Sequence, residues 1–455
     1  MRRLTDTMFS TDAMRDLLSP AATVQSMLDV EAALARAEAS CGVIPAEAVA
    51  AIVAACKLES INLDALALAA VDAGVVAIPL VKQLTAAVAR ADPEAAKYVH
   101  WGATSQDIVD SALVLQLRDA LGRIETDLLA TGDALAAQIA AHRSVVMIGR
   151  TWMQHALPIT VGVKLAGWLD ALTRHRERLA EVRRRVAVLQ FGGAAGTLAS
   201  LGKRGLAVAN ALASDLGLTV PSLPWHAHRD RVAEVATTLG LLVGTLGKIA
   251  RDVALMMQTE VGEASEAAGS EDSARGGSSA MPHKRNPVAC AAILAAATRM
   301  PGLVATMLAA MVQEHERALG GWQAEWETLP DIVRLASGAL ARTREVVAGM
   351  TIDSERMRAN LDLTHGLVMA EAVTLALGER MGRLAAHGRV AAACRRAVEE
   401  GRPLRSVLGE DAEIKSLLPA AELDRLFDAG GYLGMADEFV DRALAGWQTR
   451  STLNA

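Results

Sequence analysis

Long stretches without proline constrain the fold of this chain more than any other feature of its sequence. No proline occurs between Pro93 and Pro158, and apolar residues inside that interval recur at helical spacing, which predicts one helix over residues 108–141. At 1.5 Å per residue, about 34 residues would extend roughly 50 Å. Residues 231–263 are apolar over more than half of a helical circumference, so we expect a second long helix that is buried on most sides.

Further helical patterns flank these two segments. Residues 23–40 have apolar side chains at helical spacing with Thr23 as the expected N-cap, and residues 288–328 form another run in which Pro301 predicts a kink. No alternating apolar and polar pattern predicts a strand of useful length. We therefore predict an all-α protein with three helical domains, namely an N-terminal domain at 1–100, a central long-helix bundle at 101–350 and a C-terminal domain at 351–455. Wide apolar faces on long helices also predict association with other copies.

Composition narrows the class of protein. Hydrophobic residues make up 52% of the chain but aromatic residues only 3%, which favours helices packed closely through small side chains. The net charge of −6 disfavours nucleic acid as a partner. The four cysteines lack metal-ligand spacing, so we expect reduced thiols in a cytoplasmic protein. We expect no signal peptide, because the first residues, MRRLTDTMFS, lack an apolar core. We expect no membrane span, because no window of about 18 residues is free of charged and polar breaks.

A segment rich in glycine, serine and alanine separates two of the predicted helices. Residues 276–287 read GGSSAMPHKRNP, in which the polar members are Ser278, Ser279, His283, Lys284, Arg285 and Asn286. The two glycines permit unusual backbone angles. A mobile loop that carries hydroxyls, cations and an amide suits an anionic substrate that must be enclosed. The alternative is a solvated loop with a basic patch.

Residues 100–107, HWGATSQD, come directly before the long helix predicted at 108. Thr104, Ser105 and Gln106 would offer hydroxyl, amide and backbone donors at a helix N-terminus, which is a natural site for a carboxylate. The alternative is a structural helix cap formed by Ser105 or Asp107.

Three segments of the chain resemble motifs of the fumarase/aspartase superfamily. The segment GSSAMPHKRN resembles its signature loop, HWGATSQD resembles its H-x-G-x-T-S-x-D segment, and GRTWMQHALP at 149–158 resembles G-R-T-H-x-Q-x-A-x-P. The resemblance implies that Ser278 transfers a proton at the carbon α to a carboxylate, while Lys284 and Asn286 hold that carboxylate and stabilise an aci-carboxylate intermediate. It also implies that substrate is bound by His100, Thr104, Ser105, Gln106, Thr151 and Gln154.

The chain departs from the superfamily pattern at two linked positions. Most lyases of the superfamily carry a His after the Thr of the third segment and a Glu five residues after the signature Asn, and this pair protonates the leaving group. Trp152 and Ala291 stand at these positions here. An amine or hydroxide needs a general acid to leave, whereas a carboxylate, whose conjugate acid has a pKa of about 4, does not. The missing pair therefore indicates a carboxylate as leaving group or nucleophile, as in lactone formation by conjugate addition. We expect Trp152 to line the pocket and His155 to be structural.

The cycloisomerase branch of the superfamily shows this Trp/Ala combination, and the resemblance to it covers nearly the whole chain. It implies a muconate with several carboxylates as substrate, closed to a lactone without a metal or any other cofactor. His283, Arg285 and Arg317 are candidate cations for the extra charge, with an exposed ion pair as the alternative for Arg285. It also implies a homotetramer in which each active site draws segments from three chains. Whether a 3-carboxy or a 3-sulfo substrate is preferred stays open.

Parts of the sequence also match two other functions. An adenylosuccinate lyase-like C–N lyase shares MQTEVGE at 257–263 and the MPHKRNP form of the signature, but Trp152 and Ala291 deprive such chemistry of its acid. A non-catalytic helical scaffold derived from the superfamily would be expected to lose the loop residues, yet Ser278, Lys284 and Asn286 are all in place.

Overall fold

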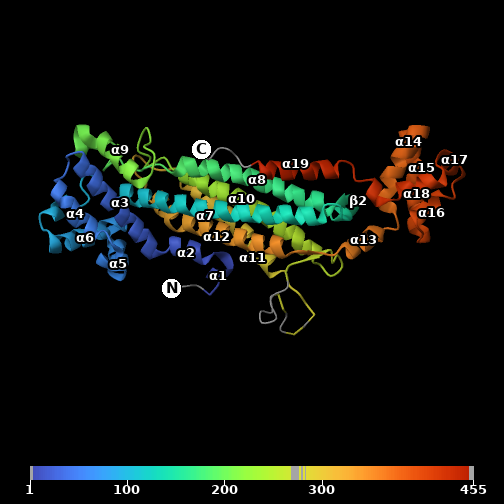
Figure 1. Cartoon of the computed structure of the whole chain (residues 1–455), viewed down its shortest axis with the longest axis horizontal. Coiled ribbons are helices and arrows are strands. Elements are labelled where there is room, and N and C mark those ends of the chain that lie inside the picture. The colour runs from blue at the N-terminus through green and yellow to red at the C-terminus, as the bar shows by residue number, and fades with distance from the viewer. Residues whose placement is uncertain (1–3, 268–275, 278–279, 282, 450–455) are drawn as a thin grey trace. The chain divides into compact units, whose positions relative to one another are not determined.

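The computed structural model describes residues 4–267, 276–277, 280–281 and 283–449, and helices predominate throughout this part of the chain (Figure 1). The α-helices are α1 Asp6–Phe9, α2 Asp12–Leu17, α3 Pro20–Ser40, α4 Ala46–Ala55, α5 Leu63–Ala73, α6 Ala77–Ala91, α7 Ser105–His142, α8 Val161–Val186, α9 Gly205–Leu216, α10 Asp230–Met256, α11 Val288–Ala309, α12 Gly321–Gly349, α13 Ser354–Asp362, α14 Ala370–Met381, α15 Arg383–Glu400, α16 Leu404–Leu408, α17 Ala412–Leu417, α18 Ala420–Leu426 and α19 Ala436–Gln448. The short 3₁₀ helices are η1 Leu58–Ser60, η2 Ala95–Tyr98, η3 Ala199–Arg204, η4 Leu367–Met369 and η5 Ala429–Gly431. The strands are β1 Val146–Thr151, β2 Gln154–Thr160, β3 Ala264–Ser265 and β4 Thr351–Ile352.

Internal contacts group the chain into two compact units. Unit 1 comprises Met1–Leu128, His175–Gly247 and Ala292–Ala341, and unit 2 comprises Leu129–Arg174, Lys248–Ala291 and Arg342–Ala455. The three-domain division expected from the sequence stays a prediction.

The long helices confirm the all-α class and correct several boundaries. Helix α7 has 38 residues and contains the predicted segment 108–141. Helix α3 begins earlier than predicted, because Ser19 rather than Thr23 is the N-cap and its side chain accepts a hydrogen bond from the backbone N–H of Ala22. Helix α10 ends at Met256, seven residues before the predicted end at 263.

The prediction of one helical run over 288–328 was wrong. The run is two helices, α11 and α12, and residues 310–320 form a connection between them. Gly320 has φ +98°, which lies in the left-handed region that favours glycine and precludes a continuous helix. Pro301 does lie inside α11, as expected.

The prediction that the chain has no strand of useful length was also wrong, because β1 and β2 form an antiparallel hairpin in unit 2. Strand β1 does not alternate: Met147 and Ile148 are both buried, and Ile148 belongs to a cluster that includes Leu361 of α13 and Met369 of η4. A strand of six residues that buries consecutive side chains has no period-two pattern for the sequence to reveal.

Each unit also contains a group of shorter helices that pack on one another. In unit 1, α3 packs against α4 and α9, and α5 pairs with α6 (Figure 1). In unit 2, α14, α15, α16, α17 and α18 gather around a core of buried apolar residues that includes Val373, Leu377 and Leu404 (Figure 1).

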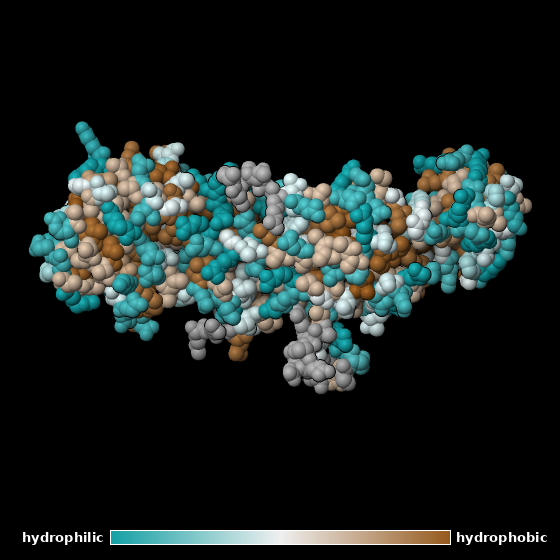
Figure 2. Space-filling view, viewed as in Figure 1, coloured by the Kyte–Doolittle hydropathy of each residue, from teal (hydrophilic) through white to brown (hydrophobic). Residues whose placement is uncertain are grey.

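Helices α10 and α11 each contain an 18-residue window that is apolar enough, by length and composition, to cross a membrane. From the sequence, we expected no membrane span. The two windows differ in burial: 61% of the α10 window is buried inside the chain, but only 33% of the α11 window. Apolar side chains also interrupt the hydrophilic surface in several places on the face shown in Figure 2.

Glu38 is a fully buried carboxyl group on α3, and neither of its oxygens has a hydrogen-bond partner among the described residues. Burial, and then the charge of Glu31, raise the pKa of Glu38 from 4.5 to about 9. The folded chain therefore holds a proton that the unfolded chain releases above its own pKa. As a result, wild-type stability declines as the pH rises from about 4.5 toward about 9.

Glu38→Gln is expected to remove this pH dependence, because the amide cannot ionise. The variant should gain stability over wild type between pH 6 and pH 9, by at most about 1.4 kcal/mol for each pH unit. Urea unfolding at several pH values, at a fixed protein concentration, measures the difference. Glu47→Gln, which changes an exposed glutamate of α4, is the matched control and should follow wild type. Parallel pH curves for Glu38→Gln and wild type would contradict the prediction.

Candidate functional site

The segment 100–107 is anchored in unit 1 by the buried carboxylate of Asp107. One oxygen, Oδ2, accepts hydrogen bonds from the backbone N–H groups of Thr104 (3.0 Å) and Gly193 (2.9 Å). The other, Oδ1, accepts from the N–H of Gly192 (2.9 Å) and lies 2.8 Å from Nε2 of His226. Asp107, the third residue of α7, therefore helps to cap this helix, which is the structural alternative that the sequence left open. It also connects the start of α7 to the backbone at Gly192 and Gly193.

Thr104 and Ser105 differ from Gln106 in what their side chains can reach. Thr104 and Ser105 are half-buried at the N-terminus of α7, and no described residue hydrogen-bonds to either hydroxyl. Gln106 is fully buried, and its Nε2 donates to Asp110 Oδ2 and to the carbonyl oxygen of His226, both at 3.0 Å. The two hydroxyls are therefore available to a ligand, whereas substrate binding by Gln106 stays a prediction that its burial disfavours.

His100 stands at the start of the same segment with φ +59°, in the left-handed region that non-glycine residues seldom occupy. Its Nδ1 lies 2.6 Å from Oε1 of Glu31, a buried residue of α3. Arg317, in the connection between α11 and α12, donates from Nη2 to the carbonyl oxygen of Ala194 at 3.0 Å. Unit 1 therefore holds both His100 and Arg317 against the segments that surround the N-terminus of α7.

Unit 1 also contains a buried ionic cluster formed by Arg229, Asp110 and Glu325. Arg229, at the start of α10, donates to both oxygens of Asp110 (2.6 and 3.0 Å) and to both oxygens of Glu325 on α12 (2.5 to 3.2 Å). Trp322 donates from Nε1 to Asp110 at 3.1 Å, and the guanidinium lies 5.0 Å from the ring centre of Trp225. Burial raises the pKa of Glu325, and Arg229 opposes that shift. The cluster connects α7, α10 and α12 through side chains that were not singled out from the sequence.

In unit 2, the predicted residues Thr151, Trp152 and Gln154 lie at the tip of the β1–β2 hairpin. Thr151 and Gln154 are paired, so Trp152 and Met153 are the two central residues of the turn, with φ +52° and +65°. Such turns usually contain Asn-Gly or Gly-Gly, and two side-chain residues there are strained. Trp152 is 97% exposed. The strain thus presents a large aromatic side chain to the outside of the chain, which is unusual without a partner or ligand to cover it.

The β1–β2 hairpin is held to the rest of unit 2 by the buried carboxylate of Glu263. Arg150 of β1 donates from both terminal nitrogens to the two oxygens of Glu263 (2.8 and 2.7 Å), and Asn360 of α13 donates to the same carboxylate at 2.8 Å. Burial, and then the charge of Arg150, lower the pKa of His155, so its imidazole is neutral at pH 7. The structural role expected for His155 stays a prediction.

The catalytic candidate Ser278 and its neighbour Ser279 lie outside the described residues. At the base of the signature loop, Asn286 donates from its backbone N–H (2.8 Å) and from Nδ2 (3.0 Å) to the carbonyl oxygen of Gly276. Gly276 has φ +72°, and a Cβ there would lie 2.4 Å from the Asn286 carbonyl oxygen, so only glycine fits. Glu266 accepts from the N–H groups of Ala289 and Cys290 at the start of α11. These contacts hold the two ends of the loop together.

The other candidate residues of the signature loop are exposed. So are Trp152 and Ala291, which replace the acid pair of the superfamily. His283, Lys284 and Arg285 are all exposed, and no described residue forms an ion pair with Arg285. Ala291 is exposed on the first turn of α11. The three motif segments fall in two units: residues 100–107 belong to unit 1, and residues 149–158 and 276–287 to unit 2.

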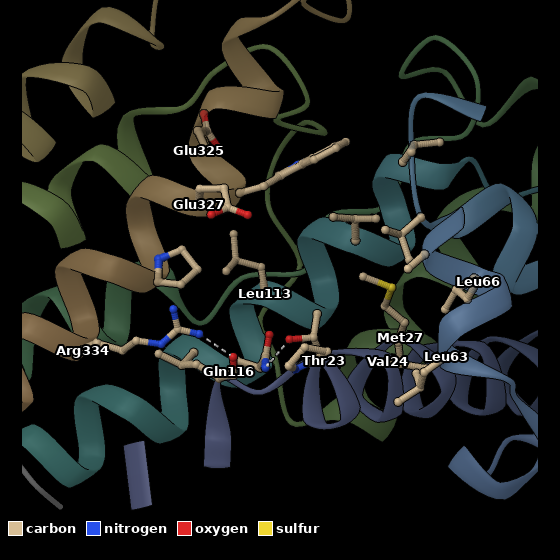
Figure 3. Close-up of a pocket in the computed structure, with 18 residues that line it drawn as sticks. Thr23, Val24, Met27, Leu63, Leu66, Leu113, Gln116, Glu325, Glu327 and Arg334 are labelled. Carbon is tan, nitrogen blue, oxygen red and sulfur yellow. Dashed lines mark hydrogen bonds between the residues drawn. The ribbon is translucent and has the colours of Figure 1, made fainter. Parts of the chain in front are cut away.

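Unit 1 also contains a cavity of about 410 Å³, bounded by α3, α5, α7 and α12. Met27, Val24 and Leu66 form its apolar side, while Gln116 and Arg334 face each other across from them (Figure 3). Both polar side chains already form hydrogen bonds within the chain: Gln116 donates to Thr23 Oγ1, and Arg334 donates to the Leu18 carbonyl oxygen. None of the predicted site residues lines this cavity, so it is distinct from the motif segments.

Among the described residues, no group of three or more His, Cys, Asp or Glu side chains is arranged to hold a metal ion.

Comparison with known proteins places the chain among lyases. A family described as "Lyase" matches residues 6–302, and a second family, "Adenylosuccinate lyase C-terminus", matches residues 366–443. The chain is 57% identical to 3-carboxy-cis,cis-muconate cycloisomerase of Pseudomonas aeruginosa, over 97% of this chain and 96% of that protein. It is 42% identical to nitrosuccinate lyase of Streptomyces davaonensis, over 94% of this chain and 91% of that one.

Among solved structures, the chain is similar to 3-carboxy-cis,cis-muconate lactonizing enzyme from Pseudomonas putida. The TM-score is 0.93 and the sequence identity 54%, and the match covers 98% of this chain and 99% of the other. The similarity therefore extends over the fold as a whole and is not confined to the three motif segments.

Proposed function

The chain belongs to the lyase family, in the branch of the 3-carboxy-cis,cis-muconate cycloisomerases, and we propose that it converts 3-carboxy-cis,cis-muconate to 4-carboxymuconolactone in the catabolism of aromatic compounds. The observation that carries the proposal is the joint replacement of the general acid pair by Trp152 and Ala291. A carboxylate nucleophile needs no base to activate it, so lactone closure does not require the missing His and Glu.

The proposed reaction is an isomerisation within one molecule. A terminal carboxylate of the substrate attacks C3, the carbon that bears the extra carboxylate, and a C–O bond forms. The electron pair of the C2–C3 double bond moves toward the other terminal carboxylate, which becomes an aci-carboxylate. A proton is then delivered to C2, the neighbouring carbon, and the lactone is complete. No atom other than this proton enters the product, and catalysis consists of stabilising charge and placing one proton.

The site residues take their proposed roles from this charge movement. Thr104 and Ser105 would donate hydrogen bonds to the substrate from hydroxyls that make no hydrogen bond to a described residue. They lie at the N-terminus of a 38-residue helix, whose dipole favours an anion. Lys284 and Asn286 would complete the clamp around the aci-carboxylate, and Ser278 would deliver the proton. His283 and Arg317 remain candidates for the third carboxylate, and Thr151, Trp152 and Gln154 for contacts from the hairpin.

We further propose that the enzyme works as a cytoplasmic homotetramer with active sites shared between chains. Only 33% of the apolar α11 window is buried in a single chain, and an identical helix is the simplest partner for such a surface. The exposed Trp152 at a strained turn supports the same proposal, because a second chain could cover it. No described cysteine forms a disulfide, which supports a reducing compartment.

A C–N lyase of the adenylosuccinate lyase type is the second candidate, favoured by the family match over residues 366–443. It would expel an amine, for which the chain lacks the acid pair. Incubation with adenylosuccinate is expected to give no fumarate.

Purified protein is expected to consume 3-carboxy-cis,cis-muconate, seen as loss of the ultraviolet absorbance of its conjugated diene. Ser278→Ala should abolish turnover while size-exclusion chromatography shows the tetramer intact. Ser416→Ala, at an exposed serine of α17, is the matched control and should retain wild-type rates. An unchanged spectrum with wild-type protein would overturn the proposed reaction, and near-normal turnover by Ser278→Ala would overturn the serine assignment. Parallel rates on the 3-sulfo analogue decide between the two substrates.

A further inference from the structure

We propose that Glu31 is a positioning residue of the substrate site, because its buried carboxylate holds the His100 ring through Nδ1 and keeps it a cation whose Nε2–H is left for a substrate carboxylate. The inference rests on the proposed function and deepens it, since it assigns one of the cations that a substrate with three carboxylates requires. Glu31 lies on α3, 69 positions before His100, and no sequence motif joins the two.

The geometry leaves His100 little freedom. The Nδ1 to Oε1 distance is 2.6 Å. This is slightly shorter than the roughly 2.7–2.9 Å of a typical charge-assisted N–H···O hydrogen bond. The Glu31 side chain is 1% exposed and the His100 side chain 18% exposed, so the contact is shielded from water. The backbone at His100 is strained at φ +59°, and such strain persists only where the surroundings impose it. No described residue hydrogen-bonds to Nε2, so the donor on the opposite edge of the ring is available.

The charged groups around this pair favour the imidazolium. Burial by itself lowers the pKa of His100, but the charge and hydrogen bond of Glu31, with a smaller contribution from Asp107 on α7, raise it above its ordinary value. Glu38, two turns along α3, and Cys56, after α4, also face Glu31. Burial and the Glu31 charge raise the pKa of Glu38 to about 9 and that of Cys56 to about 12, so both are neutral at pH 7. His100 is thus the counter-ion of the Glu31 carboxylate.

A pH dependence follows from this arrangement. Because the His100 pKa is raised, the imidazolium is fully present at low pH and disappears as the pH rises through the folded-state pKa. Substrate affinity should decline over the same range, since the cation that holds a carboxylate is lost. Glu31→Gln keeps the size of the side chain but removes the charge, so the decline should begin at a lower pH.

The first experiment measures kcat and KM of wild type and Glu31→Gln on 3-carboxy-cis,cis-muconate between pH 6 and pH 9.5. For the variant, we expect the fall in kcat/KM at high pH to move down by about one pH unit or more. At pH 8 the effect should be an increase of about tenfold in KM with little change in kcat, because a charge-assisted hydrogen bond contributes about that factor. Superimposable pH profiles would overturn the proposal.

Glu38→Gln is the matched control, because Glu38 is equally buried on the same helix but is already uncharged at neutral pH. Its kinetic pH profile should match wild type up to about pH 8, where Glu38 is still protonated in both proteins, and this separates a charge effect from a disturbance of packing. A double-mutant cycle with His100→Asn gives a second test, since asparagine tolerates a positive φ and does not titrate. If Glu31 acts through His100, adding Glu31→Gln to His100→Asn should leave KM unchanged. A further tenfold rise would overturn the proposal.

A third measurement does not depend on turnover. Diethyl pyrocarbonate acylates neutral imidazole, so the rate at which it modifies His100, followed by peptide mass spectrometry against pH, reports the pKa of that ring. We expect a lower pKa in Glu31→Gln than in wild type, and equal values would overturn the role of Glu31. Absence of turnover by wild type would instead overturn the proposed function, and the modification rates would still decide whether Glu31 holds the charge of His100.

Discussion

Arg229→Met is expected to destabilise the protein by about 3–5 kcal/mol, which is the cost of leaving buried carboxylates without their counter-ion. Arg229, Asp110 and Glu325 are each no more than 2% exposed. Removing the guanidinium leaves two carboxylates without a counter-ion in a medium of low dielectric. It also removes the hydrogen-bond donors from which both carboxylates accept. Urea unfolding followed by circular dichroism measures the loss, at a fixed protein concentration because assembly also stabilises the chain.

Two variants separate the charge effect from lost packing. Arg90→Met, at an exposed arginine near the end of α6, should change stability by less than about 0.5 kcal/mol. Adding Asp110→Asn and Glu325→Gln to Arg229→Met should recover part of the stability, because neutral amides need no counter-ion. A stability of Arg229→Met within about 0.5 kcal/mol of wild type would show that the buried cluster contributes little.

Lys284→Met is expected to lower kcat by about 10²- to 10³-fold, the usual effect of removing one donor that stabilises a developing oxyanion. The proposed reaction builds charge on a carboxylate that becomes an aci-carboxylate, and Lys284 is the cation of the signature loop to which we assign its stabilisation. Its side chain is exposed in the single chain, so the loss of kcat should come with no loss of folding stability. Initial rates on 3-carboxy-cis,cis-muconate and a thermal unfolding curve test both parts.

Lys57→Met provides the matched control, because it removes an exposed lysine between α4 and η1, far along the chain from all three motif segments. It should retain wild-type kcat. If Lys284→Met kept kcat within threefold of wild type, the carboxylate clamp would have to be assigned to other residues.

Much of the fold could be predicted because it depends on local properties of the chain. The length of α7 follows from an apolar pattern without proline, and such a pattern acts over one or two turns of helix. Two of the wrong boundaries depend on single residues: Ser19 caps α3 through its side chain, and Gly320, directly before α12, has a positive φ that precludes a continuous helix. The β1–β2 hairpin escaped prediction because its turn is built from Trp152 and Met153, which have no preference for positive φ.

The three motif segments could be identified from the sequence alone, since the identity and order of side chains decide which protons and charges a loop can offer, and the roles assigned to their residues stay proposals. The absence of the acid pair at Trp152 and Ala291 was equally visible there, and it narrowed the reaction. Only the tertiary structure decided what holds these segments in place. Glu31 reaches His100 across 69 positions, Asp107 reaches Gly193 across 86, and Trp322 reaches Asp110 across 212. A buried charge selects its partner by distance in space, and that distance leaves no periodic trace along the chain.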